Sequence, residues 1–231
     1  MRVAVVTGAS KGLGRALANG LADHGWALVI DARGAEDLQK VCDDLVDTTR
    51  VVAVPGDVTD PRHRARLAAE AAALGGAALL VNNASDLGPS PLPRLVDYPI
   101  DELRRVFEVD VLAPLAMVQE LRPQLVRHRG TVLNISSDAA VEAYEGWGGY
   151  GAAKAALDQL TAVLAAEEPG LRVLAVDPGD LRTEMHQRAY PGEDISDRPE
   201  PESVVPHLLA ILADPPAGVR HRAADVAGAR A

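Results

Sequence analysis

Three side chains in the second half of the sequence have the types and spacing of a proton-transfer site. Tyr150 and Lys154 are four positions apart in a segment of helical periodicity, so they share one helix face and the ammonium can lie near the phenol. A tyrosine has an ordinary pKa of roughly 10, and a nearby cation favours the phenolate and lowers that pKa. Tyr150 is therefore a candidate general acid or base. Ser137, at the end of a strand-like run, can donate a hydrogen bond to the same substrate oxygen.

A Tyr-x-x-x-Lys pair also arises by chance in many helices, so the pair alone predicts little. Two further observations favour the catalytic interpretation. The chain contains only three lysines among its basic residues, so a lysine at position 154 is not simply the common choice. The second observation is a glycine-rich segment near the N-terminus.

That segment, residues 7–14 (TGASKGLG), follows a strand-like run and opens a helical segment. Glycines at such a turn let the backbone approach a pyrophosphate, whose charge the helix N-terminus stabilises. The spacing is G-x-x-x-G-x-G, which differs from the commoner G-x-G-x-x-G. A plain glycine-rich turn is the alternative, but the strand–turn–helix setting favours phosphate binding.

The segments that must position these residues alternate between short apolar runs and amphipathic stretches. We predict strands at Arg2–Val6, Ala27–Asp31, Val51–Val54, Ala77–Val81, Gly130–Ile135, Leu171–Val176 and, in the tail, Val219–Ala223. We predict helices at Gly12–His24, Ala35–Val46, Pro61–Leu74, Ile100–Val126 and Trp147–Glu167. Such alternation is typical of an α/β protein with a parallel sheet covered on both faces. With no linker or repeat visible, we expect one doubly wound domain over residues 1–231, with a loose alanine-rich end.

Composition narrows the function classes. The 48% hydrophobic content is enough for a large core, and the net charge of −10, without a basic block, argues against nucleic acid or an anionic membrane as partner. The single cysteine, Cys42, excludes an internal disulfide. No apolar run is long enough to span a bilayer, and the first strand leaves no room for a signal peptide. We expect a cytoplasmic protein.

Taken together, four motifs resemble the compact, single-domain branch of the short-chain dehydrogenase/reductase family. They are residues 7–14, Asn82-Asn83-Ala84, the Ser137/Tyr150/Lys154 set, and Pro178-Gly179. They occur in the family's order and at its spacings, and they cover essentially the whole chain. The resemblance implies a Rossmann-type sheet of about seven strands and NAD(P)-dependent interconversion of a ketone or aldehyde and an alcohol.

The resemblance also implies a role for each matching position. Tyr150 would donate the proton, Lys154 would hold the nicotinamide ribose and lower the tyrosine pKa, and Ser137 would polarise the carbonyl; Ser136 is its nearest competitor. No metal ligand is implied. The residues expected at the cofactor are Gly8, Ser10, Lys11, Gly12, Leu13, Gly14, Arg33, Asp57, Val58, Asn83, Ala84, Tyr150, Lys154, Pro178, Gly179 and Thr183.

One position departs from the family pattern. Family members usually have an asparagine where this chain has Asp110, and that asparagine helps a water molecule join the lysine in a proton relay. Aspartate keeps the backbone carbonyl but loses the amide donor and adds a charge. The relay is therefore in doubt, and Asp110 is the one feature that favours an alternative: a catalytically weak dinucleotide-binding regulatory or scaffold protein of the same fold.

The end of the second predicted strand bears on the choice between NAD(H) and NADP(H). An acidic residue there favours the free 2′-hydroxyl of NAD, and an arginine accommodates the 2′-phosphate of NADP. The family's acidic position falls on Ala32, followed by Arg33, whereas Asp31 comes one residue early and should point away from the ribose. Lys11 adds a second cation. These residues favour NADP(H), with NAD(H) possible.

The substrate side is less informative. Residues 182–203 are rich in Pro, Asp and Glu and predict a mobile lid over a small carbonyl or alcohol substrate. His186, on that lid, is expected to be exposed. Long Ala-, Leu- and Val-rich helices resemble those through which family members form homodimers or homotetramers. Candidates for an apolar pocket, each of which ordinary packing would also explain, are Leu87, Val141, Tyr144, Trp147, Met185 and Tyr190.

Overall fold

The computed structural model of the chain describes residues 1–228. Within these residues, seven strands form one parallel sheet in the order β3-β2-β1-β4-β5-β6-β7. The strand order reverses between β1 and β4, and ligands of open α/β sheets bind at the carboxyl ends of strands at such a point. The strands are β1 (Val3–Val6), β2 (Ala27–Ala32), β3 (Val51–Pro55), β4 (Ala77–Asn82), β5 (Thr131–Ile135), β6 (Arg172–Asp177) and β7 (Arg220–Arg222).

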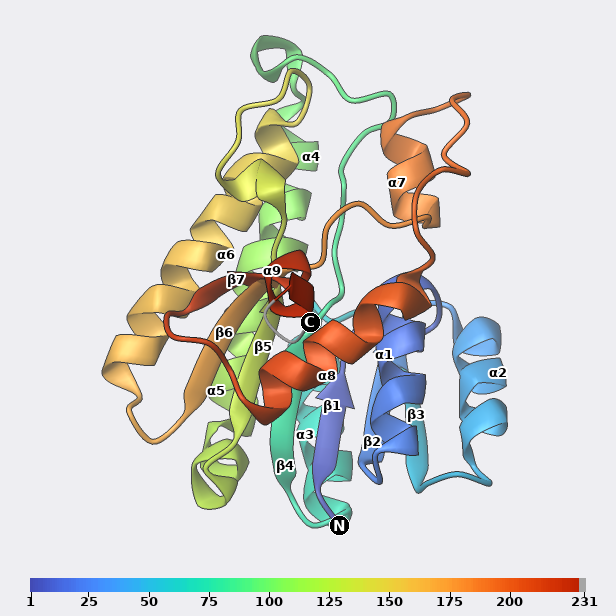
Figure 1. Cartoon of the computed structure of the whole chain (residues 1–231), viewed down its shortest axis with the longest axis vertical. Helices are drawn as coiled ribbons and strands as arrows, with labels where there is room; N and C mark the ends of the chain where they lie inside the picture. The colour runs from blue at the N-terminus through green and yellow to red at the C-terminus, as the bar shows by residue number, and fades with distance from the viewer. Residues whose placement is uncertain (229–231) are drawn as a thin grey trace.

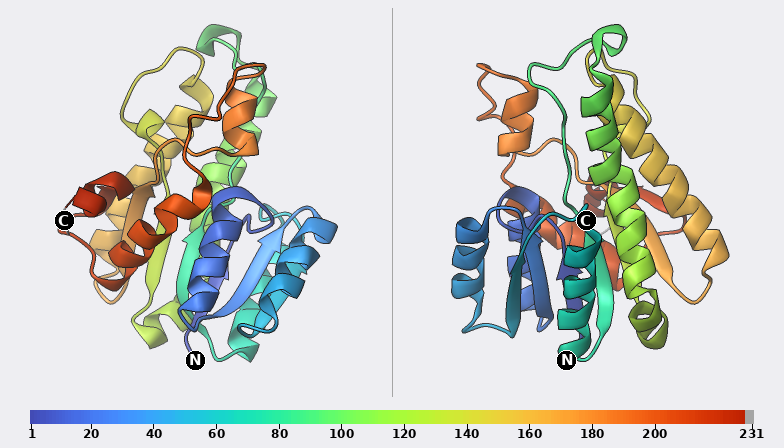
Figure 2. Two further views of the ribbon diagram at one scale, coloured as in Figure 1. Left: turned by 45° about the vertical axis from the view of Figure 1, so that its right-hand side comes forward. Right: turned by 180° about the vertical axis from the view of Figure 1, so that it is seen from behind.

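Helices cover both faces of the sheet. Figure 1 shows α1, α2 and α8 across the near face, and the second view of Figure 2 shows α3, α5 and α6 on the opposite face. The helices are α1 (Gly12–Asp23), α2 (Ala35–Leu45), α3 (Pro61–Ala73), α4 (Ile100–Phe107), α5 (Ala113–His128), α6 (Gly148–Glu167), α7 (Glu184–Ala189), α8 (Val205–Ala213) and α9 (Ala223–Gly228).

The apolar runs form strands because both of their faces are buried. In β2, Leu28 and Ile30 pack into the core under α1 and α2, while Val29 packs into the core under α3. Each of these side chains is inaccessible to solvent. Such continuous apolar runs are typical of parallel strands covered on both sides.

The predicted doubly wound parallel sheet is confirmed. Each predicted strand lies within one residue of the observed one at both ends, because apolar runs and turn residues mark these boundaries locally. Helix α8 was not predicted, and the alanine-rich end, predicted to be loose, forms α9 as far as residue 228. Residues 229–231 of that end lie outside the described part of the chain.

The predicted helix Ile100–Val126 is not a single regular helix. A π-helical turn, Glu108–Leu112, separates α4 from α5. Such a turn widens the helix by one residue locally and is frequent at functional sites. Asp110 lies in it and is completely buried.

Within residues 1–228, no helix combines the length and the apolar character that crossing a bilayer requires.

Candidate active site

A cleft of about 930 Å³ opens at the carboxyl edge of the sheet, next to the point where the strand order reverses. All the predicted site residues except Asp110 line it, from Gly8 in the first turn to Thr183 before α7. Figure 1 shows why segments so distant in sequence meet there: the loops after parallel strands all emerge at the same edge. Asp110 lies behind Lys154 rather than on the cleft wall.

Helix α6 presents Tyr150 and Lys154 to this cleft from one face. Both side chains are at least nine-tenths buried, and the ammonium lies 5.4 Å from the centre of the Tyr150 ring. Lys154 Nζ donates a hydrogen bond of 2.9 Å to the Ile135 carbonyl at the end of β5. The helix spacing thus brings the phenol and the cation together, as their separation in sequence predicts.

Ser137 reaches the same region from the end of β5. Its Oγ donates a hydrogen bond of 3.1 Å to Asp138 Oδ1 and accepts one of 3.2 Å from the Ala139 N–H. A substrate carbonyl that takes the Ser137 hydrogen would therefore replace Asp138 as acceptor. Ser136, the competitor, has a buried Oγ without a hydrogen-bond partner among the described residues.

Asp110 forms a buried ion pair that the sequence does not reveal. Its Oδ1 lies 3.1 Å from Lys154 Nζ, and the two side chains are almost wholly inaccessible. Ser85 Oγ donates a hydrogen bond to the same oxygen, and the Asp86 N–H donates one of 3.0 Å to Oδ2. With three donors aimed at it, the carboxyl is surrounded as an anion requires. The residue that departs from the family pattern thus touches the catalytic candidate Lys154 directly.

Burial and the two neighbouring charges have opposing effects on the pKa of Tyr150. Burial raises the pKa of Tyr150 above its ordinary value, Lys154 opposes that rise, and Asp110 adds to it. Burial alone would lower the pKa of Lys154, but Tyr150 and Asp110 raise it above its usual value. Lys154 therefore acts on the phenol in the expected direction, but its effect is outweighed by burial.

We expect Asp110→Asn to retain or raise turnover, because an amide oxygen can still accept hydrogen bonds and Lys154 keeps the Ile135 carbonyl. Losing the negative charge lowers the pKa of Tyr150. Carbonyl reduction needs Tyr150 protonated, so the fall of kcat/KM at high pH should begin at lower pH in the variant. Measured pH–rate profiles of both proteins test this. A large loss at every pH would show that the carboxylate itself takes part in turnover.

The first turn has the geometry that a dinucleotide pyrophosphate requires. Gly8 and Gly12 adopt φ values of +67° and +54°, which favour glycine. At the start of α1, the N-cap residue Lys11 makes no side-chain capping bond, and the first helical turn contains no acidic residue. The unsatisfied N–H groups there are suited to a phosphate. The residues present therefore fit a nicotinamide dinucleotide.

Gly14→Ala should distort this turn. A Cβ at Gly14 would lie 2.3 Å from the Gly8 carbonyl oxygen and 2.4 Å from Asn83 Nδ2, so the backbone would have to move. We expect cofactor affinity to fall at least about tenfold and the free energy of unfolding by about 1–3 kcal/mol. Gly34→Ala is the matched control, because Gly34 lines the same cleft but a Cβ there meets nothing within 4 Å. Fluorescence titration with cofactor and thermal unfolding compare the two; equal affinities would contradict the prediction.

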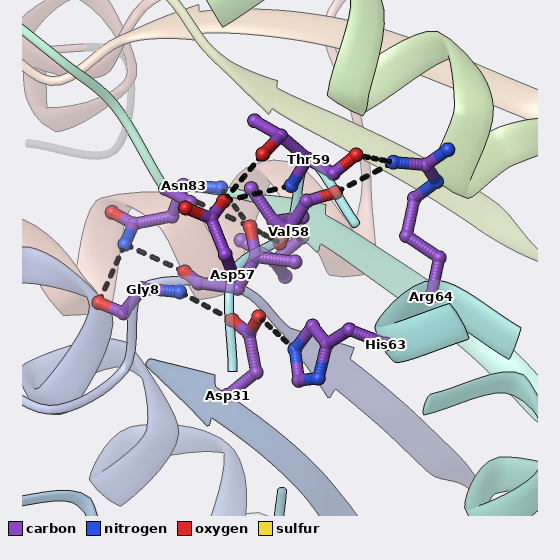
Figure 3. A network of polar contacts seen from close by, with 11 residues as sticks. Gly8, Asp31, Asp57, Val58, Thr59, His63, Arg64 and Asn83 are labelled. Carbon is purple, nitrogen blue, oxygen red and sulfur yellow. Dashed lines mark hydrogen bonds and ion pairs between the residues drawn. The ribbon is translucent and has the colours of Figure 1, made fainter. Parts of the chain in front are cut away.

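A polar network holds the first turn against the neighbouring loops (Figure 3). Asn83 Nδ2 donates hydrogen bonds to the Thr7 and Gly8 carbonyls, at 2.8 and 3.0 Å. Asp57 Oδ1 accepts hydrogen bonds from the N–H and the hydroxyl of Thr59, at 2.9 and 2.8 Å. The loop after β3, which carries Asp57, and the loop after β4, which carries Asn83, are therefore ordered beside the glycine turn.

The charged residues at the end of β2 and in the glycine turn differ in their exposure and in their partners. Arg33 is exposed on the cleft wall and makes no ion pair within residues 1–228. Lys11 pairs instead with Glu184 of α7, and both side chains are largely exposed. Asp31 is buried and accepts a hydrogen bond of 2.8 Å from the Gly8 N–H. Among the residues that the structure describes, the cation left free at the cleft is thus Arg33.

The substrate candidates separate into two groups. Leu87, Trp147 and Met185 line the cleft and pack near Tyr150, and Tyr190 packs in the same cluster without lining the cleft. Val141 and Tyr144 are exposed beside a separate shallow depression, so they do not form part of this cleft.

The expectation that His186 is exposed is wrong. The side chain is buried, and its ring lies 5.0 Å from that of Tyr190. Thr183 caps α7 by accepting a hydrogen bond from the His186 N–H.

With this geometry established, comparisons with known proteins identify the family. The sequence profile of the family described as short chain dehydrogenase matches residues 2–194. The chain belongs to the short-chain dehydrogenase/reductase family. It is an oxidoreductase of the kind that binds a nicotinamide dinucleotide and acts on a small molecule.

Relatives of this short-chain dehydrogenase/reductase differ in the reactions that their names state. This chain is 31% identical to L-rhamnose 1-dehydrogenase (NAD(P)(+)) of Sphingomonas sp., over 87% of this chain and 79% of the relative. It is 35% identical to sepiapterin reductase of Mus musculus, over 81% of this chain and 77% of the relative. An alcohol dehydrogenase of Thermococcus sibiricus, solved in complex with 5-hydroxy-NADP, has a TM-score of 0.85 at 26% identity and covers 96% of this chain and 94% of its own.

Three polar residues of the candidate active site were not predicted from the sequence. Ser85 and Asp86 bond to Asp110, and Asp138 accepts the Ser137 hydrogen. All three line the cleft. Their position offered a signal, because they directly follow the motif residues at the carboxyl ends of β4 and β5, where polar side chains meet.

Proposed function

We propose that this protein is an NADP(H)-dependent oxidoreductase that interconverts a ketone or aldehyde and an alcohol, with Tyr150 as general acid and base. One observation carries the proposal: Tyr150 and Lys154 lie buried side by side on the wall of the cleft that also contains the glycine turn. When bound, the nicotinamide supplies or accepts the hydride.

The residues of this chain would handle the proton and the substrate oxygen. In reduction, the Tyr150 hydroxyl gives its proton to the carbonyl oxygen, and in oxidation the phenolate takes it back from the alcohol. Ser137 Oγ donates a hydrogen bond to the same oxygen and so favours the negative charge that develops on it. Lys154, held by Ile135 and Asp110, keeps a positive charge beside the phenol throughout.

The preference for NADP(H) rests on Arg33. Its guanidinium stands at the end of β2 without an ionic partner among residues 1–228, where a 2′-phosphate can pair with it. Lys11 contributes less directly, because Glu184 already pairs with it. Both oxygens of Asp31 are engaged by the Gly8 N–H and by His63, so this carboxylate offers no free oxygen to the ribose.

The substrate proposed is a small or medium-sized, mostly apolar carbonyl compound. Leu87, Trp147 and Met185 supply an apolar wall next to Tyr150. The segment 182–203, with α7 at its start, is proposed as the lid over it. Assembly into a homodimer or homotetramer stays a prediction, for which the exposed Leu112, Val126 and Val163 near α5 and α6 are candidate contacts.

NADPH oxidation by the purified protein over a panel of ketones, diketones, quinones and keto sugars tests the proposal. Turnover that disappears in Tyr150→Phe supports it. The second candidate, a regulatory dinucleotide-binding protein, draws on the Asp110–Lys154 ion pair, which departs from the family pattern. It predicts tight NADPH binding with no consumption by any carbonyl compound, whether Tyr150 is present or not.

A further inference from the structure

Arg220, the first residue of β7, bridges three segments that meet at the candidate active site. Its Nη2 donates a hydrogen bond of 2.9 Å to the Ser137 carbonyl, and its Nε donates one of 2.8 Å to Asp158 Oδ2. Asp177 Oδ2 lies 3.8 Å from the same Nη2. Arg220 lies outside residues 2–194, which the family profile matches, so the family motifs assign it no role.

The bond to Ser137 acts on the residue whose hydroxyl must meet the substrate oxygen. The Ser137 carbonyl accepts a second hydrogen bond, of 3.2 Å, from the Ala140 N–H, which closes the short turn after β5. The bond from Arg220 is the shorter of the two, and its donor is charged, so it is the stronger. Arg220 therefore does most to fix the peptide group that follows Ser137.

The two carboxylates tie Arg220 to the other parts of the site. Asp158 lies on α6 four residues after Lys154, so the two share one face of the helix. Asp177 is the last residue of β6, and its Oδ1 accepts a hydrogen bond of 2.9 Å from the Gly179 N–H, in the segment expected at the nicotinamide. One partly buried guanidinium thus joins the end of β5 to α6 and to the end of β6.

We propose that Arg220 is a positioning residue: by holding the Ser137 carbonyl against α6, it aligns the Ser137 hydroxyl with the Tyr150 hydroxyl on one substrate oxygen. Within residues 1–228, the cleft wall does not include Arg220, so it acts through Ser137. The inference rests on the proposed function, in which both hydroxyls bind the same oxygen. Alignment matters because a displacement of about 1 Å can lower a rate about a hundredfold.

The first test compares kcat with thermal stability, at saturating NADPH and substrate. Arg220→Met removes the bond to Ser137 but also leaves Asp158 without its cation, which lowers the melting temperature. Arg220→Met/Asp158→Asn removes that unpaired charge, so much of the melting temperature should return. Its kcat should stay about ten- to a hundredfold below the wild-type value, because Ser137 is still not held. A wild-type kcat in this double variant would mean that Arg220 only stabilises the fold, and would overturn the inference.

Arg222→Met is the matched control. Arg222 lies two residues further along β7, is largely exposed, and has Asp177 as its ion-pair partner, at 3.8 Å, among the described residues. The substitution removes the same kind of charge from the same strand and leaves the bond to the Ser137 carbonyl in place. Its kcat should stay within about threefold of the wild-type value. A loss equal to that of the Arg220 variants would show that the charge of β7, not the contact with Ser137, affects turnover, and would overturn the inference.

A second test asks whether Arg220 acts through Ser137. In a Ser137→Ala background there is no hydroxyl to align, so Arg220→Met/Asp158→Asn should lower kcat by less than about threefold. The same factor in both backgrounds would overturn the inference. Full activity of Ser137→Ala alone would contradict the proposed function as well, whereas an inactive Ser137→Ala beside fully active Arg220 variants would contradict the inference alone.

Amide hydrogen exchange measures the positioning without any substrate. The Ala139 and Ala140 N–H groups donate hydrogen bonds, each of 3.2 Å, to the Ser137 Oγ and carbonyl. In Arg220→Met/Asp158→Asn we expect these two amides to exchange at least about tenfold faster, while the amides of β1 keep their wild-type rates. Unchanged exchange at Ala139 and Ala140 would overturn the inference, even for a protein whose substrate is still unidentified.

Discussion

Tyr150→Phe is expected to lower kcat for carbonyl reduction by about 10³-fold, within the range that a general acid contributes. The substitution removes only the hydroxyl, since the phenylalanine ring can keep the edge contact with Trp147, 5.8 Å between centroids, and the position beside Lys154. Buried packing and the glycine turn should be unaffected. The affinity for NADPH should therefore stay within about threefold of the wild-type value.

Steady-state kinetics and fluorescence titration on the same preparation separate these two effects. Tyr98→Phe is the matched control: it removes the same hydroxyl from a buried tyrosine outside the cleft, whose hydroxyl has no hydrogen-bond partner among residues 1–228. Its kcat should remain close to the wild-type value. Full activity of Tyr150→Phe would remove Tyr150 from the proposed mechanism, whereas loss of NADPH binding would indicate a structural role instead.

Lys154→Met is expected to lower the free energy of unfolding by about 3–5 kcal/mol, the cost of leaving one member of a buried ion pair uncompensated. Asp110 is completely inaccessible and would keep only Ser85 and the Asp86 N–H as donors. Turnover should also fall strongly, because the cation beside Tyr150 is lost. Urea unfolding and NADPH oxidation assays measure the two consequences.

The double variant Lys154→Met/Asp110→Asn distinguishes the two roles of the lysine. Removing the second charge takes away the unpaired anion, so most of the lost stability should return. Turnover should not return, because no cation stands beside the phenol. A double variant as unstable as Lys154→Met would show that the ion pair with Asp110 is not what stabilises this region.

Most of the fold was predictable because it depends on local patterns. Apolar runs such as Ala27–Asp31 are bounded by glycines and polar residues, and they form strands wherever both faces are buried. The structure differs from the predicted elements where contacts between residues distant in the sequence determine the local conformation. The π-helical turn at Glu108–Leu112 interrupts an otherwise regular periodicity, and α8 pairs with α1 through the close contact of Val205 and Gly20.

The site residues that could be predicted are those that lie in or near the turns at the carboxyl ends of the strands. Gly8 and Ser137 lie just after strands β1 and β5, Tyr150 lies at the start of the helix that follows β5, and parallel strands bring their carboxyl ends to one edge. Their individual roles stay predictions until the variants are measured. Sequence periodicity gave no means of finding the partners of Asp110 and Lys11, because Lys154 and Glu184 come from distant elements.

The sequence by itself thus determined the sheet, the glycine turn and the helix spacing of Tyr150 and Lys154, since each depends on neighbouring residues in the chain. Only the tertiary structure decided which charges are buried together: Asp110 with Lys154, and Asp31 with His63. The physical reason is desolvation. A buried charge must find a partner wherever the packed elements bring one, and burial, together with that pairing, shifts the pKa of Tyr150.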